Sequence, residues 1–168
     1  MKCSLFFCFV CLLSYSGLSK AKGLRAHVHG AVSLDLASDK NELLVMLSSP
    51  SESFLAFEHK AKSKKEKALV ERVKKSWVLG FDKYLGELSL EDCSITDAKW
   101  KQEFTGKNHS NIFAEGYLRC KKPLQGRKLT ISLKDNYARI QTIGVQVLKE
   151  NGQVINEKYR EKKFNIEL

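Results

Sequence analysis

Between Arg25 and Leu36 the chain alternates strictly between two kinds of residue. One set is apolar or small: Ala26, Val28, Gly30, Val32, Leu34 and Leu36. The other set is mostly polar: Arg25, His27, His29, Ala31, Ser33 and Asp35. A period of two residues predicts a half-buried strand with the first set toward the core. Turn-forming residues at 38–41 and a second apolar run at 43–47 extend this prediction to a β-hairpin.

A helix is predicted after this hairpin, over residues 62–79, because Leu69, Val73 and Trp77 recur every four positions. The second strand ends at Ser48-Ser49-Pro50, and Ser51 or Ser53 could cap a short helical turn before the main helix.

The remainder of the chain reads as strands. Short apolar or alternating runs predict them at residues 88–95, 112–120, 129–133, 143–147 and 164–168. Asn151-Gly152 is the strongest local hairpin signal, and Trp100 falls in a segment that reads as a polar loop. The expected fold class is α+β: a mostly antiparallel sheet or sandwich with one or two helices inserted after the second strand.

The first 21 residues have the composition of a secretory signal peptide. Lys2 precedes an apolar run at 3–13, and Ser19-Lys20-Ala21 places small residues before a cleavage point. Cleavage near Gly17 and an uncleaved N-terminal anchor are the alternatives, although the apolar run is short for a membrane span of about 20 residues. We therefore expect a signal peptide at 1–21 and a single domain at 22–168.

Removal of this segment changes the cysteine count. Three of the five cysteines leave with it, which keeps Cys93 and Cys120. Two cysteines in an exported protein most simply form one disulfide. A pair of metal ligands or a redox couple is the alternative, but the chain has no CxxC spacing.

The chain of 168 residues has a net charge of +10, and its basic residues gather at 60–80, where eight Lys and Arg stand against two Glu. Such a helix is either a solvated face or a surface that contacts anionic lipid or an acidic partner. Export and the lack of interleaved aromatic residues argue against nucleic acid as a partner.

The chain also lacks a nucleophile elbow, a phosphate loop and a dinucleotide fingerprint, so we do not expect an enzyme.

Histidine is the residue type that suggests chemistry. On a strand, His27 and His29 would project from the same face, a geometry that suits two ligands of one zinc ion. The same spacing also occurs on ordinary solvated surfaces, and His59, beside apolar residues, could be structural.

A series of motifs adds a family resemblance. In chain order they are His27-Val28-His29-Gly30, Ser49-Pro50, Phe57-Glu58-His59, Cys93, His109-Ser110-Asn111, Cys120 and Asn151-Gly152-Gln153. Together they resemble the ZrgA-like periplasmic zinc-binding family. The resemblance implies a periplasmic location, zinc binding and a role in zinc acquisition, with five residues at motif positions for the metal: His27, His29, Glu58, His59 and His109.

The chain departs from the family pattern in two places. Asn111 stands where the family has Asp, and residues 98–108 contain no histidine where many relatives carry a His/Asp-rich insertion. We therefore expect one compact zinc site without an ion-collecting loop.

Two hypotheses follow. The first is a non-enzymatic periplasmic protein that binds Zn²⁺ through His27, His29 and His59, with Glu58 or His109 completing the site, and hands the ion to a zinc-uptake transporter component. The second is a basic, disulfide-stabilised envelope interaction module that binds anionic lipid or a protein partner and keeps a residual metal site.

Overall fold

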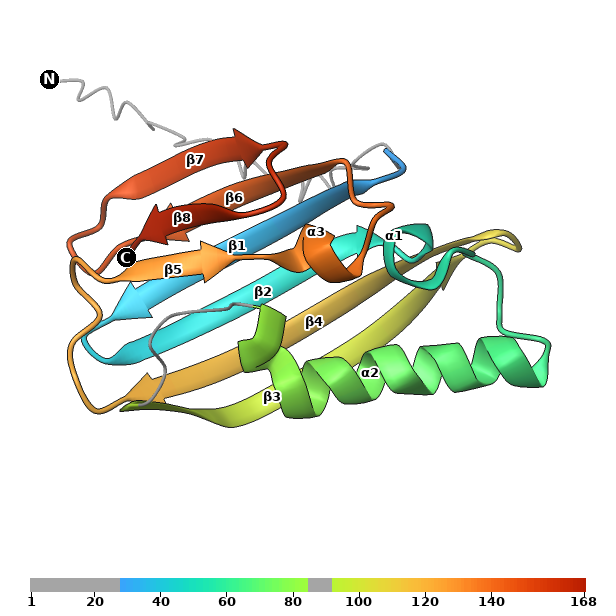
Figure 1. Cartoon of the computed structure of the whole chain (residues 1–168), viewed down its shortest axis with the longest axis horizontal. Coiled ribbons are helices and arrows are strands. Elements are labelled where there is room, and N and C mark those ends of the chain that lie inside the picture. Colours follow the sequence, from blue (N-terminus) through green and yellow to red (C-terminus); the bar gives the residue numbers. More distant parts are fainter. Residues whose placement is uncertain (1–27, 85–91) are drawn as a thin grey trace, which may run out of the picture.

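The computed structural model describes residues 28–84 and 92–168 (Figure 1). Six strands form the main sheet, in the spatial order β3 (Cys93–Thr105), β4 (His109–Cys120), β2 (Glu42–Pro50), β1 (Ala31–Asp39), β6 (Thr142–Leu148) and β7 (Val154–Tyr159). A separate antiparallel pair joins β5 (Lys128–Ile131) to β8 (Phe164–Glu167). The described helices are α1 (Glu52–Leu55), α2 (Lys64–Tyr84) and α3 (Leu133–Asn136).

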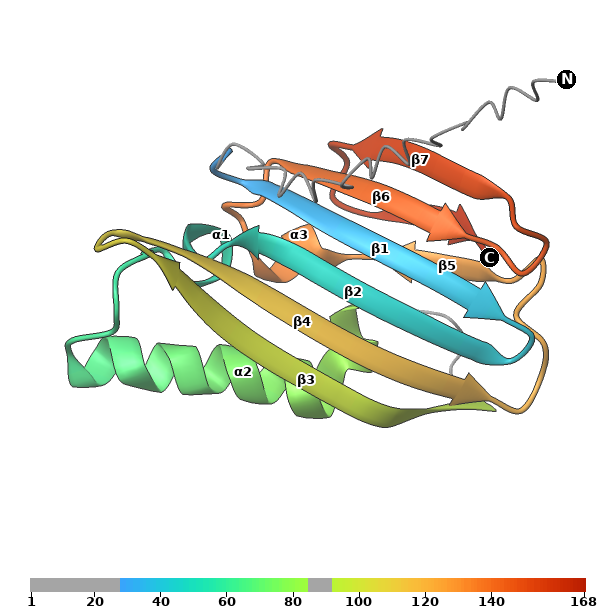
Figure 2. The same ribbon diagram turned by 180° about the vertical axis from the view of Figure 1, so that it is seen from behind.

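The molecule is layered. α2 and the β5–β8 pair lie on one face of the main sheet, and no described element covers the opposite face (Figures 1 and 2). We call these the covered face and the open face. Alternate residues of the central strands, such as Leu34, Val45 and Ile112, point toward the covered face and are fully buried. Burial of these apolar side chains drives the packing of the layers.

The predicted α+β class is confirmed. The strand pairs of the main sheet are antiparallel except β1–β6, and α1 and α2 follow the second strand as expected. The β1–β2 hairpin forms at the predicted turn, where Lys40 has a φ of 49°. The β6–β7 hairpin turns at Asn151-Gly152, where Gly152 supplies a φ of 82°.

The predicted disulfide is also confirmed. Cys93 opens β3 and Cys120 closes β4, and the two residues are directly paired across the strands. They are 27 residues apart in the sequence. A loop of this size stabilises a fold by about 3–4 kcal/mol in chain-entropy models.

The predicted first strand begins later than expected. Residues 29–30 form a turn, and the strand starts at Ala31. Gly30 has a φ of 76°, and its carbonyl oxygen accepts hydrogen bonds from the backbone of Gln141 and Thr142. A left-handed backbone interrupts the alternation, so Val28 is exposed rather than in the core. His29 therefore lies in a turn, whereas His27 lies outside the described residues.

The apolar pattern did not predict most of one strand, β3, or any of another, β7, because many of their residues are polar or charged. β3 spans 13 residues, including Trp100, which is half-buried and packs against the core rather than lying in a polar loop. The charged residues Asp97, Lys99 and Lys101 alternate with it on the open face, so high charge concealed a period of two. β7 is an edge strand with mostly exposed side chains, and it was not predicted.

The proposed signal peptide at 1–21 lies outside the described residues, as does the first half of the strand predicted at 88–95, whose last three residues are the start of β3. The division into a signal peptide and one domain stays a prediction. In residues 28–84 and 92–168, no helix is both long enough and apolar enough to cross a membrane.

Candidate metal centre

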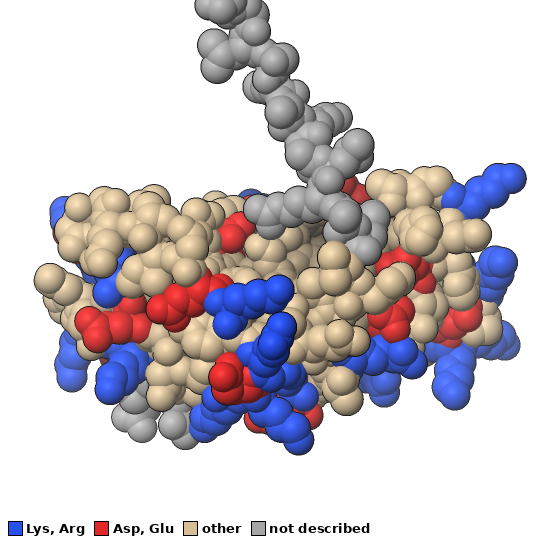
Figure 3. Space-filling model, turned by 90° about the horizontal axis from the view of Figure 1, so that it is seen from above, with Lys and Arg blue, Asp and Glu red and all other residues tan. Residues whose placement is uncertain are grey.

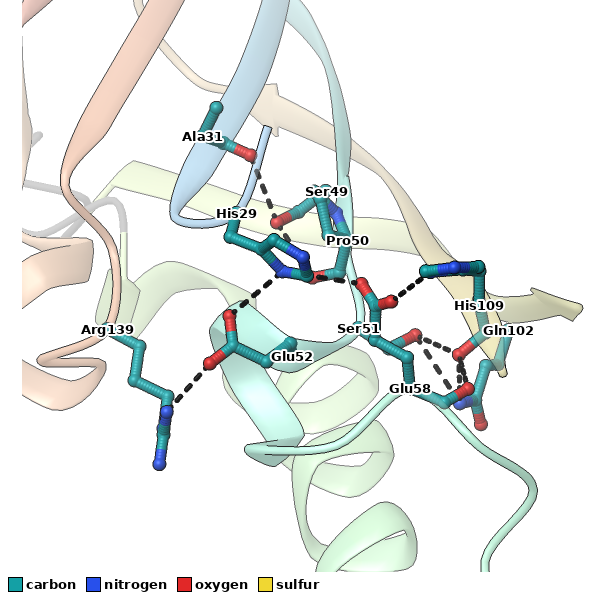
Figure 4. A network of polar contacts seen from close by, with 11 residues as sticks. His29, Ala31, Ser49, Pro50, Ser51, Glu52, Glu58, Gln102, His109 and Arg139 are labelled. Atoms are coloured by element: carbon teal, nitrogen blue, oxygen red, sulfur yellow. Dashed lines mark hydrogen bonds and ion pairs between the residues drawn. The ribbon is translucent and has the colours of Figure 1, made fainter. Parts of the chain in front are cut away.

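The candidate ligands meet at one end of the main sheet, where β1 begins, β2 ends and β4 begins. The strand register places these three ends together, because Ser33 pairs with Ser48 and Pro50 pairs with Asn111. His29 comes from the turn before β1, Glu58 from the loop after α1, and His109 is the first residue of β4. Figure 4 shows the Glu58 carboxylate between the two imidazoles.

Glu58 is the centre of the contacts. One carboxylate oxygen, Oε2, lies 2.7 Å from His109 Nδ1, and the other, Oε1, lies 3.9 Å from His29 Nδ1. The Glu58 side chain is only 6% exposed, whereas the side chains of His29 and His109 are 60% and 56% exposed. A buried carboxylate is thus flanked by two imidazoles that solvent can reach.

A buried hydroxyl network fixes the backbone at Glu58. Ser110 Oγ donates a hydrogen bond to the Glu58 carbonyl oxygen at 2.5 Å and lies 2.8 Å from Ser51 Oγ. The side-chain amide of Gln102 donates to Ser110 Oγ at 3.1 Å, and both serines are fully buried. The position of Glu58 therefore depends on protein hydrogen bonds that a metal ion does not supply.

The α1 helix supports the same loop from its other side. Phe54 of α1 packs edge-on against Trp77 of α2, with ring centroids 5.9 Å apart. Ala56, at the end of α1, adopts a left-handed conformation with a φ of 66°, which turns the chain toward Glu58. These contacts hold the loop between the sheet and α2.

The donors present fit a cation. Glu58 Oε1 is buried, and none of the described residues forms a hydrogen bond with it. A buried carboxylate oxygen without a partner is costly, and a bound cation would remove that cost. Carboxylate oxygen and neutral imidazole nitrogen are donors that Zn²⁺ accepts.

The centre is not closed around an ion. Among residues 28–84 and 92–168, no group of three or more His, Cys, Asp or Glu side chains is already arranged to hold a metal. Of the two imidazoles, His29 is the farther from Glu58, at 3.9 Å, and its side chain is the most exposed of the three. An ion held by these donors would replace the direct Glu58–His109 hydrogen bond and draw in His29, so the three side chains would rearrange on binding.

His59 takes a different partner from its neighbour Glu58. Its Nε2 lies 3.2 Å from Glu66 Oε1, and its ring lies 5.0 Å from that of Phe57. The second oxygen of Glu66 accepts hydrogen bonds from the backbone N–H groups of Lys62 and Ser63. In return, Ser63 Oγ accepts from the Glu66 backbone N–H, which completes a capping box at the start of α2.

These contacts lower the pKa of the Glu66 carboxyl group. The backbone N–H of Ser63, followed by that of Lys62 and by His59, lowers the pKa of Glu66 from 4.5 to about 2. The His59 imidazole thus ties the loop to the helix cap. The structure brings His29, Glu58 and His109 together but does not bring His59 into their cluster.

One charged contact was not predicted. Glu52, in the first turn of α1, lies 3.6 Å from His29 Nδ1 through Oε2 and 2.7 Å from Arg139 Nη1 through Oε1. Nothing in the local sequence marks Glu52, because it reaches His29 only through the folding of α1 beside the start of β1.

The role of Ser110 could be suspected only from its place beside His109.

Comparison with known proteins gives one family. Residues 26–166 match the ZrgA family, described as a family of zinc uptake proteins. No curated protein matches the chain.

Proposed function

Since the chain belongs to the ZrgA family of zinc uptake proteins, we propose that it captures Zn²⁺ through His29, Glu58 and His109 and passes the ion to an uptake transporter. The observation that carries this proposal is the buried Oε1 of Glu58, which lies between two exposed imidazoles and accepts no hydrogen bond from the described residues. The carboxylate provides fixed negative charge, and the imidazoles provide neutral nitrogen donors from the solvent side.

Three protein donors leave one position of a tetrahedral zinc ion open. His27, two residues before His29, is the predicted residue that could fill it; water is the alternative. An exchangeable fourth ligand suits a protein that releases its metal, whereas structural zinc sites are closed by four protein ligands. We therefore assign the ion as cargo rather than as a structural element.

The proposed location is the periplasm, on the strength of the N-terminal sequence. The proposed activity is binding and transfer without catalysis, because the sequence carries no nucleophile or phosphate-binding motif. The transporter component that would receive the ion is part of the same proposal.

Zinc titration of the exported protein against a chromophoric chelator tests the ligand set. We expect one Zn²⁺ per chain, bound more tightly than micromolar. His29→Ala/His109→Ala should weaken binding at least about a hundredfold, since losing even a residue that only orients a ligand costs 10–100-fold. His59→Ala is the matched control and should change the affinity less than about threefold, because its partner is Glu66.

The pH dependence gives a second readout. Zinc binds neutral imidazole, so the affinity should fall as the pH drops below about 6.5. Absence of binding at micromolar zinc would overturn the proposal. So would a double variant that binds as tightly as the wild type.

A further inference from the structure

Positive charge is distributed unequally over the molecule. A run of Lys and Arg occupies the solvent side of α2 and the segment that leads into it, and we call it the basic strip: Lys60, Lys62, Lys64, Lys65, Lys67, Arg72, Lys74 and Lys75. All eight residues are exposed. Figure 3 views the molecule from the β7 edge, opposite to α2, and Lys and Arg also gather there along the lower margin, on the side of the covered face.

The strip is not neutralised from within. None of its eight side chains forms an ion pair with another residue of the described ranges, 28–84 and 92–168. Only two acidic residues lie among them, and one, Glu66, is engaged by the helix cap and His59. The strip therefore keeps its positive field.

The open face differs. Lys99 lies 3.0 Å from Asp97 and 3.6 Å from Glu115, and Arg119 lies 2.6 Å from Glu42. Lys101 likewise pairs with Glu103. These three cations are matched by neighbouring carboxylates, whereas the eight of the basic strip are not.

We propose that the basic strip docks the protein on a surface of anionic phospholipid. Each Lys or Arg near such a surface contributes roughly 1 kcal/mol of attraction, which fades within a Debye length. Cations without a protein partner can contact headgroups without first breaking an ion pair. Eight of them on one side give enough attraction for reversible peripheral binding.

The composition of the strip favours lipid over an acidic protein. Protein interfaces centre on buried apolar and aromatic anchors inside a polar rim. Between Lys60 and Lys75 the exposed residues other than Lys and Arg are Ser63, Ala68 and Glu71, none of which is such an anchor. Attraction without an apolar centre is typical of headgroup binding at the membrane surface.

Docking would also place the metal centre close to the lipid. Lys60 follows Glu58 by two residues in the same loop, so the loop that carries the strip's first cation also carries the central carboxylate. The attraction itself needs no metal, and the docking test can be done with a chelator present.

Co-sedimentation with vesicles tests the proposal. We expect the full exported protein to bind vesicles of mixed phosphatidylcholine and phosphatidylglycerol, to ignore pure phosphatidylcholine, and to dissociate as salt is raised. Lys64→Glu/Lys65→Glu/Lys67→Glu should weaken binding at least about a hundredfold. Negative charge is favourable in the first turn of a helix, so this variant should keep its fold.

The matched control reverses the same number of charges elsewhere. Lys99→Glu/Lys101→Glu/Lys158→Glu changes the net charge equally but on the open face, and its binding should fall far less. Circular dichroism on every variant checks folding. If the charge reversal does not fold, the neutral variant Lys64→Gln/Lys65→Gln/Lys67→Gln replaces it in the vesicle assay.

Four outcomes would overturn the proposal: no binding to anionic vesicles at low salt, equal binding to pure phosphatidylcholine, equal losses in the two reversals, or retention on polyglutamate without any vesicle binding. The last outcome would point to an acidic protein partner. Because chelator is present throughout, none of these results bears on zinc binding.

Discussion

Two His–Glu contacts start from adjacent residues and serve different purposes. Glu58 meets His109 at the end of the sheet, and His59 meets Glu66 at the start of α2. The first carboxylate is 6% exposed, and one of its oxygens has no hydrogen-bond partner among the described residues, whereas the second is 28% exposed and has hydrogen bonds on both oxygens. The difference teaches that a His–Glu pair alone does not indicate a cation site. The indication is a buried carboxylate oxygen that still lacks a hydrogen bond.

The largest expected effect comes from the central carboxylate. Glu58→Gln removes the negative charge but keeps the shape of the side chain, and we expect zinc affinity to fall at least about a hundredfold. Glu66→Gln is the matched change in the other contact and should alter zinc affinity less than about threefold. Competition titration of both variants measures the contrast. Equal losses would show that the two contacts form one functional unit.

A smaller effect is expected from the hydroxyl network under Glu58. Ser110→Ala leaves buried polar partners unsatisfied and should lower the free energy of unfolding by about 1–3 kcal/mol. It should also weaken zinc binding about tenfold, the range for residues that orient a ligand. Urea unfolding and zinc titration measure the two effects.

Ser63→Ala is the corresponding control at the other contact. Loss of this helix cap should cost about 1 kcal/mol of stability, while zinc affinity stays at the wild-type value. A zinc affinity unchanged in Ser110→Ala would mean that Glu58 does not depend on the network for its position.

The fold could be predicted from the sequence in part, and the missed elements have a common physical reason. Apolar periodicity predicted the β1–β2 hairpin, the α2 helix and the α+β class, because the core is built from alternating residues such as Leu34 and Val45. It failed at β3, where charged residues on the open face obscure the alternation. Local pattern cannot show which face of a strand will be left uncovered by the rest of the chain.

The candidate centre was predicted by its residue types and not by its geometry. The motifs named Glu58 and His59 together, but the sequence does not show that their side chains take different partners. That separation depends on Ser110 from a distant strand and on Glu66 seven residues along the chain. Contacts of this kind appear only when the sheet brings distant segments together.

The smallest expected effect is a change with pH in the stability that Glu66 contributes at the His59–Glu66 contact. The pKa of Glu66 is lowered from 4.5 to about 2, first by the backbone N–H of Ser63. A carboxylate with a lowered pKa adds stability that is fully present above pH 4.5 and disappears as the pH falls toward 2. The wild type should therefore exceed Glu66→Gln in unfolding free energy near neutral pH, and this margin should shrink below pH 4.5. Glu71→Gln, on the same helix, controls for the loss of one negative charge. A margin that does not change with pH would show that the cap holds equally well when Glu66 is protonated, which would remove the electrostatic distinction between the two contacts.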